Sequence, residues 1–273
     1  MRWTLDDIPW DRFDPAKVTP DLLAVAKTAA LVEANSADYV AYLNNIFHDD
    51  DDFKAVACQW GVEEEQHGRA LGRWAELADP DFSFHKSLAE FRRGYRLPLD
   101  ANQSVRGSRL GELIARCVVE TGTSSFYSAI HDACGEPVLK MIAKHIASDE
   151  FFHYQLFEKH AKRYETKDKL SRLSRLKIAL GRVREAEDDE LAYAYYSANI
   201  AFAKTPEKYD RARCAATYWR QAMGLYREKH LQNATRMILR AAAFNADGWL
   251  AAVASKVSWT LLQRRQNRLS RAA

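Results

Sequence analysis

Apolar residues recur every three or four positions along almost the whole chain, and no segment of useful length alternates apolar with polar residues. This pattern predicts amphipathic helices and no sheet, so the expected fold class is all-α. In the first half we expect helices over 20–46, from the acidic run 49–52 to 77, and over 86–95, 108–133 and 137–163. In the second half we expect helices over 169–185, 187–203, 206–230, 231–243 and 246–268.

Local start and stop signals set several of these boundaries. Thr19, Pro20 and Asp21 supply a capping hydroxyl, a helix-starting proline and an acidic first turn. Ser108 is placed to cap the helix that follows it, and the Cys-Gly-Glu-Pro turn at 134–137 separates the last two helices of the first half. The long connection 80–107 has the length that a bundle with parallel central helices requires.

Four glutamates and two histidines form a pattern that occurs twice in the first half of the chain. A lone Glu precedes a Glu-x-x-His pair by 31 residues, and a second lone Glu precedes a second such pair by 30. In a helix, positions i and i+3 lie on the same face, so each pair directs two side chains toward one point. Each Glu lies on an apolar stripe, where an unpaired charge would be costly. The residues are Glu33, Glu64, His67, Glu120, Glu150 and His153.

Buried carboxylates at this spacing require a cation. Four helices, two that supply Glu and two that supply Glu-x-x-His, are how a four-helix bundle holds a di-iron or di-manganese centre. Carboxylates with one imidazole per metal suit iron or manganese, whereas the thiolates typical of structural zinc are missing from the pattern. We therefore expect two Fe per chain, with manganese or a mixed Mn/Fe pair as the alternatives.

Three short segments resemble a known family. Residues 60–68, Trp-Gly-Val-Glu-Glu-Glu-Gln-His-Gly, resemble the W-x-x-E-E-N-R-H-G stretch of the soluble acyl-acyl carrier protein desaturases, which belong to the ferritin-like di-iron superfamily. Residues 149–153, Asp-Glu-Phe-Phe-His, resemble that family's D-E-x-R-H stretch, and residues 120–123, Glu-Thr-Gly-Thr, are similar to the start of its E-R-A-T-F motif. The resemblance covers residues 20–165.

The resemblance implies roles for individual residues. The six residues of the repeated pattern would be the iron ligands, with Glu64 and Glu150 bridging both metals. Glu63 and Asp149 would each hold the imidazole of the opposite half-site, and Thr123 would lie near bound dioxygen and help to route protons. The Arg that precedes each ligand His in the family is replaced here by glutamine at position 66 and phenylalanine at position 152.

The expected organisation is a single ferritin-like domain. Residues 1–18 would form an arm over the body, residues 19–167 the metal-binding four-helix bundle, and residues 168–273 basic helices packed on it. At 273 residues and 47% hydrophobic, the chain can bury one large core.

The resemblance favours a di-iron oxidoreductase that activates dioxygen and desaturates an acyl chain on acyl carrier protein. Other di-iron oxygenases, which hydroxylate a carbon or oxidise an amine, would share every ligand. A ferritin- or rubrerythrin-like ferroxidase or peroxidase and a binding protein with a vestigial site are further alternatives. Candidates to line an apolar substrate channel are Phe126, Tyr127, Phe151, Leu156 and Tyr39.

The charge distribution of the chain and the cofactor motifs that it lacks indicate which partner proteins to expect. No cysteine cluster or nucleotide-binding glycine motif is present, so we expect a separate ferredoxin-type electron donor. Residues 168–273 have a net charge of +10 against −7 for residues 1–167, which suits an acidic acyl carrier protein. No nucleic-acid motif accompanies this charge. The candidate docking residues are Arg172, Arg175, Lys177, Arg182 and Arg184.

Composition also bounds the location of the protein. The four cysteines are scattered without a Cys-x-x-Cys pair, and no signal peptide is recognisable. The apolar stretch Trp249–Leu262 is interrupted by Ser255, Lys256 and Ser258, so it falls short of a membrane span. We expect a cytoplasmic homodimer.

Overall fold

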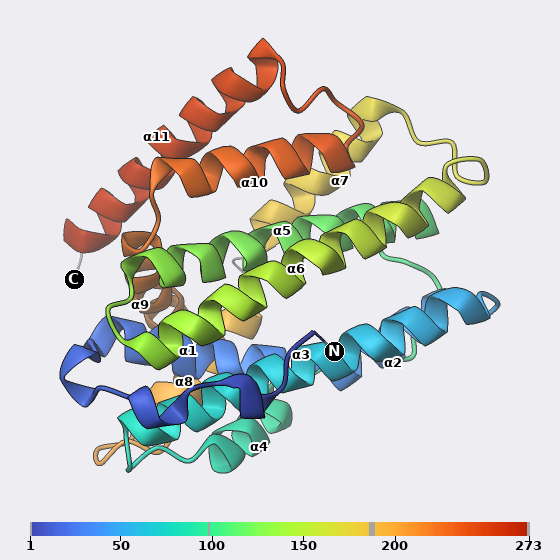
Figure 1. Ribbon diagram of the computed structural model, residues 1–273. Coiled ribbons are helices and arrows are strands. Elements are labelled where there is room, and N and C mark those ends of the chain that lie inside the picture. Colours follow the sequence, from blue (N-terminus) through green and yellow to red (C-terminus); the bar gives the residue numbers. More distant parts are fainter. Residues whose placement is uncertain (1, 98, 186–188, 272–273) are drawn as a thin grey trace.

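A computed structural model describes residues 2–97, 99–185 and 189–271, and all regular structure in those ranges is helical (Figure 1). The predicted all-α class is confirmed. The helices are α1 (Pro20–Glu33), α2 (Ser36–Ile46), α3 (Asp51–Ala78), α4 (Phe84–Gly94), α5 (Arg109–Ala133), α6 (Pro137–Tyr164), α7 (Arg172–Glu185), α8 (Asp189–Asn199), α9 (Arg211–Gly224), α10 (Glu228–Ala241) and α11 (Trp249–Arg271).

The two long helices α5 and α6 form the most extensive helix pair of the fold. A short turn connects them and they run antiparallel along their length (Figure 1). The side chain of Glu136 fixes this turn, because it accepts hydrogen bonds from the backbone N–H groups of Val138 and Leu139 and from Nε1 of Trp74 on α3. Helix α3 packs against α6 and α1, so α1, α3, α5 and α6 together enclose a shared interior.

The predicted single helix over 20–46 is wrong, because α1 ends at Glu33 and α2 begins at Ser36. Contacts with residues far away in the sequence stabilise the interruption between α1 and α2. Arg92 on α4 donates to the carbonyl oxygen of Ala34 at 2.7 Å, and the Ser36 hydroxyl donates to the carbonyl oxygen of Gly61 at 2.8 Å. A Cβ atom at Gly68 would approach the backbone nitrogen of Ala34 to 2.6 Å, so glycine permits α3 to lie against this junction.

Boundaries in the second half also differ from the prediction. The expected helix over 206–230 is shorter, since α9 begins at Arg211 and α10 begins at Glu228. The side chain of Asp210 caps α9 by accepting from the backbone N–H of Arg213 at 3.0 Å. Part of the helix expected over 187–203, residues 187–188, lies outside the described residues, and α8 ends at Asn199.

Most of the helices after residue 168 pack on α1 or α5, two of the enclosing helices. Helices α8 and α9 contact α1, while α7 and α10 contact α5 (Figure 1). Helix α11 packs on α9 and α10 and leaves Trp249, Val253, Val257 and Leu261 exposed. Within the described ranges, none of the helices combines the length and apolar character needed to cross a bilayer.

The N-terminal arm consists of three short 3-10 turns, Leu5–Asp7, Trp10–Arg12 and Pro15–Lys17. Trp3 and Ile8 anchor it, because both side chains are buried in the main hydrophobic core. In Figure 1 the arm passes along α3 and α6, on the side opposite α10 and α11.

Candidate di-metal centre

The four enclosing helices bring the repeated Glu and His pattern to one point. Each of α1 and α5 supplies one carboxylate, and each of α3 and α6 supplies a carboxylate and an imidazole one turn later. All six side chains are buried. They are Glu33, Glu64, His67, Glu120, Glu150 and His153.

Ligand-type atoms of these residues form two overlapping groups, in each of which the atoms lie within 4.8 Å of one another. Both groups contain the same two carboxylates. The first group also contains Glu33 and His67, and the second also contains Glu120 and His153. The shared pair is Glu64 and Glu150. The arrangement has the form of two adjacent metal positions with two common ligands.

Distances show how the shared carboxylates lie between the two imidazoles. Glu64 places one oxygen 3.0 Å from Nδ1 of His153 and the other 3.5 Å from Nδ1 of His67. Glu150 places its two oxygens 3.2 Å from Nδ1 of His67 and 3.8 Å from Nδ1 of His153. Each carboxylate can therefore offer one oxygen to each metal position.

Unsatisfied atoms in the cluster show that a cation fits it. Nδ1 of both histidines is buried and lacks a hydrogen-bond partner among the described residues, as does one oxygen each of Glu64, Glu120 and Glu150. Buried polar groups are normally paired, and unpaired carboxylates are costly. Hard oxygen donors with one imidazole at each position suit iron or manganese.

The protonation of the cluster reflects its crowding. Burial, together with the neighbouring carboxylate Glu64, raises the pKa of Glu33 well above its usual value, and burial together with Glu150 does the same for the pKa of Glu120. Burial alone would lower the pKa of His67, but the hydrogen bond to Asp149 and the closeness of the carboxylates of Glu150, Glu33 and Glu64 to Nδ1 raise it well above the usual value. A metal ion that enters the cluster must therefore displace protons.

Two further acids orient the histidines, and each acid binds the histidine of the opposite helix. Nε2 of His67 on α3 donates to Asp149 on α6 at 3.1 Å, and Nε2 of His153 on α6 donates to Glu63 on α3 at 2.9 Å. Both contacts leave Nδ1 turned toward the carboxylates. Fixing the second nitrogen of a ligand imidazole in this way sets its tautomer and its direction.

The N-terminal arm contributes contacts that the sequence analysis missed. Nε1 of Trp3 donates to Asp149 at 2.7 Å, and Nε of Arg2 donates to the other oxygen of the same carboxylate at 2.9 Å. The Trp3 ring is parallel to His67 with ring centroids 6.0 Å apart, and its carbonyl oxygen accepts from Gln66 at 3.0 Å. The one local signal is an aromatic residue in a terminal segment that mixes aromatic and acidic residues, and such a signal does not specify a partner 146 residues away.

Replacing Trp3 by phenylalanine is expected to weaken metal binding about tenfold, because changes around a ligand His lower affinity by roughly 10–100-fold. Trp10→Phe is the matched control, since Trp10 Nε1 donates within the arm to the carbonyl oxygen of Leu5. Competition for Mn(II) with a coloured chelator measures both affinities. Equal affinities in the two variants would show that Trp3 does not support the site.

Hydroxyl groups satisfy two of the cluster carboxylates. Thr123, one turn after Glu120, donates to Glu150 at 2.7 Å, and Tyr127, one turn further along α5, donates to Glu33 at 2.5 Å. Tyr127 was a candidate channel residue, and its hydroxyl instead binds a carboxylate of the cluster. This contact was not foreseen, although Tyr127 lies on the same stripe of α5 as Glu120.

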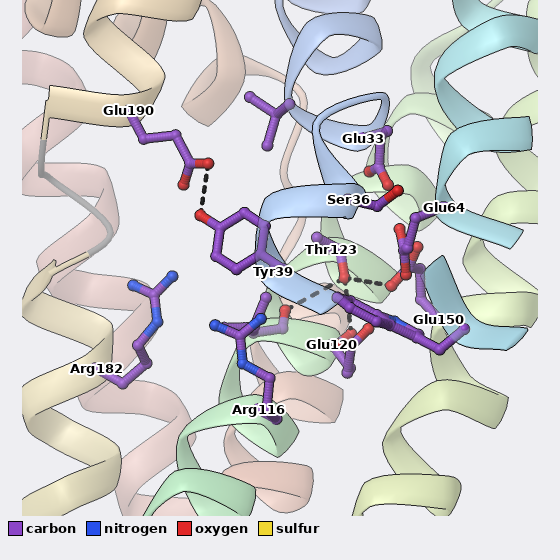
Figure 2. A pocket seen from close by; sticks show the side chains of 13 residues that line it. Glu33, Ser36, Tyr39, Glu64, Arg116, Glu120, Thr123, Glu150, Arg182 and Glu190 are labelled. Carbon is purple, nitrogen blue, oxygen red and sulfur yellow. Dashed lines mark hydrogen bonds between the residues drawn. The ribbon is translucent and has the colours of Figure 1, made fainter. Parts of the chain in front are cut away.

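A cavity of about 70 Å³ opens beside the cluster and is lined by residues of α1, α2, α3, α5, α6, α7 and α8 (Figure 2). One wall contains the carboxylates and Thr123, and the other contains Tyr39, Arg116, Arg182 and Glu190. Such a volume accommodates a few water molecules or a small group. The other channel candidates lie elsewhere: Phe126 in the core, Leu156 against a second core cluster, and Phe151 on the surface.

The candidate docking residues of α7 do not share one environment. Arg182 lines the cavity, and Arg175 is paired with Glu165, to which it donates at 2.5 Å. Arg172, Lys177 and Arg184 are exposed. A basic surface on α7 would therefore consist of the exposed three.

Comparison of the sequence with protein-family models finds no matching family, and comparison with curated proteins finds no matching relative. The short motifs and the geometry of the cluster are thus the basis for a functional assignment.

Proposed function

We propose that the protein is a di-iron oxidoreductase of ferritin-like architecture that binds two iron ions per chain and uses dioxygen to oxidise an organic substrate. The observation that carries this proposal is the pair of overlapping ligand groups that share Glu64 and Glu150. Ferritin-like di-iron and di-manganese proteins arrange their ligands in this way. Manganese, alone or in a mixed pair with iron, satisfies the same donor set.

A bound iron pair would supply dioxygen chemistry toward an unactivated C–H bond, once it has been reduced. The chain supplies the surroundings of that chemistry. Asp149 and Glu63 fix the two imidazoles, and the Thr123 hydroxyl places an exchangeable proton between Glu150 and the cavity. Val32 and Val119 form apolar parts of the cavity wall, which limits water at the reacting position.

The electrons would come from a separate protein, for which a ferredoxin-type donor is the expected class. Cys58, Cys117, Cys134 and Cys214 are all free thiols in the described structure, and three of them are buried. These cysteines form no cluster among the described residues, and the candidate metal-binding groups found in that part of the chain contain only Glu and His. An iron-sulfur centre within the described residues would need such a cysteine cluster.

The family resemblance favours desaturation of an acyl chain on acyl carrier protein. The cavity of about 70 Å³ is small, so a long chain would need the surrounding helices to separate. Hydroxylation or amine oxidation of a compact substrate requires less rearrangement, and we propose it as the second candidate. Two guanidinium groups in the cavity wall can pair with an acidic group of an organic molecule. This supports an organic substrate over the iron-storage and peroxidase alternatives.

The test is metal analysis of protein produced with iron, followed by oxygen consumption. We expect about two Fe per chain, because the cluster offers four carboxylates and two imidazoles. Chemically reduced protein should consume dioxygen, and protein supplied with NADH alone should not. Stoichiometric zinc, or no bound metal, would overturn the proposal, and particle size from light scattering would reveal a storage cage.

A further inference from the structure

Arg116 is a buried cation one helical turn before the ligand Glu120. Its residue is only 7% exposed, and its Nε has no hydrogen-bond partner among the described residues. The nearest acid is Glu112, with Oε1 3.9 Å from Nε. Glu112 is already bound through its other oxygen by the hydroxyls of Tyr42 at 3.0 Å and Ser104 at 2.7 Å. A buried guanidinium with so weak a partner is costly unless something else binds it.

A second guanidinium enters the same cavity from another helix. Arg182 on α7 lines the cavity together with Arg116, and no hydrogen bond or ion pair of Arg182 is found in the part of the chain that the structure describes. Figure 2 shows both guanidinium groups on the side of the Tyr39 ring, across the cavity from Glu64 and Glu150. The Tyr39 ring lies 4.9 Å from Cζ of Arg116.

Within the described residues, the acids near the cavity accept hydrogen bonds from hydroxyl groups or would bind metal ions, rather than forming close hydrogen bonds with this pair. The carboxylates of the cluster would be neutralised by two divalent metal ions, which removes them as partners for Arg116. Glu190 accepts a hydrogen bond from the Tyr39 hydroxyl at 2.6 Å. Together with Glu112, it offsets the formal charge of the two guanidinium groups, so a ligand with one negative charge leaves less uncompensated charge in the cavity than a phosphate dianion does.

We propose that Arg116 and Arg182 bind the carboxylate of a compact organic acid, which is the substrate of the di-metal centre. The two oxygens of a carboxylate match the planar fork of guanidinium N–H groups. The carbon atoms then extend across the cavity toward Thr123 and the metal positions, and the volume of about 70 Å³ limits them to a short chain. This inference rests on the proposed function and names a free acid, where the desaturase resemblance implies a carrier-bound thioester.

The experiment is calorimetric titration of Mn(II)-loaded protein with butanoate, using butanamide as the neutral probe of the same size and phosphate as a second anion. We expect butanoate to bind and butanamide and phosphate not to bind measurably. Arg182→Gln should weaken butanoate binding about 10–100-fold, because a hydrogen-bonded charge pair is lost. Lys177→Gln and Arg184→Gln are the matched controls, since both side chains are exposed on the same helix.

Arg116→Lys tests the buried partner without removing its charge, and it should also weaken butanoate binding. Metal content is measured on every sample, so that the variants are compared at equal metal loading. If the metals alone held the carboxylate, all the variants would bind butanoate with equal affinity. That result, or equal binding of butanoate and butanamide, would overturn the inference while the metal site stands. Absence of metal from the wild-type protein would instead contradict the proposed function.

Discussion

Replacing Glu150 by glutamine is expected to reduce the metal content from about two ions to fewer than one per chain, since this carboxylate belongs to both ligand groups. The amide is nearly isosteric, so the side chain still fills its buried position. It removes one negative charge and one of the two ligand oxygens that face Nδ1 of His67 and His153. Elemental analysis of the purified variant, loaded with excess Mn(II) and then desalted, measures the effect.

Three further variants make this result specific. Glu65→Gln is the control, because Glu65 is exposed on the same helix as Glu64 and lies outside both ligand groups. Glu33→Gln and Glu120→Gln each alter one group only, so each should retain about one ion. Two tightly bound ions in the Glu150 variant would show that the shared carboxylates do not hold both metals.

Removal of the metals is expected to destabilise the native protein by about 5 kcal/mol relative to protein in which both sites are about a hundredfold above their dissociation constants. The metal-free fold must bury four carboxylates within one cluster, and the raised pKa values of Glu33 and Glu120 express that cost. For a chain of this length, such a difference corresponds to a melting temperature lower by roughly 10–20 °C.

Differential scanning calorimetry of chelator-treated and Mn(II)-loaded protein measures this shift. The Glu150→Gln variant serves as the internal control, since its melting temperature should depend much less on added Mn(II). A wild-type melting temperature that does not respond to chelator or to metal would mean that the buried acids are satisfied by protons alone.

Local sequence signals were sufficient to predict helix starts that depend only on neighbouring residues. The side chains of Thr19 and Ser108 cap their helices as predicted, by accepting from the backbone N–H groups of Leu22 and Gly111. The prediction of a helix over 20–46 failed, because Arg92 and the close approach of α3 at Gly68 stabilise the break after Glu33. These contacts join residues that are far apart in the chain.

The sequence by itself determined the all-α class and the six candidate ligands, because helical periodicity and the i, i+3 spacing of Glu and His are local properties. Only the tertiary structure decided what surrounds them. Trp3 reaches Asp149 across 146 positions, and Arg116 and Arg182 meet at one cavity from separate helices. Such pairings depend on how helices pack, and no spacing within a helix encodes them.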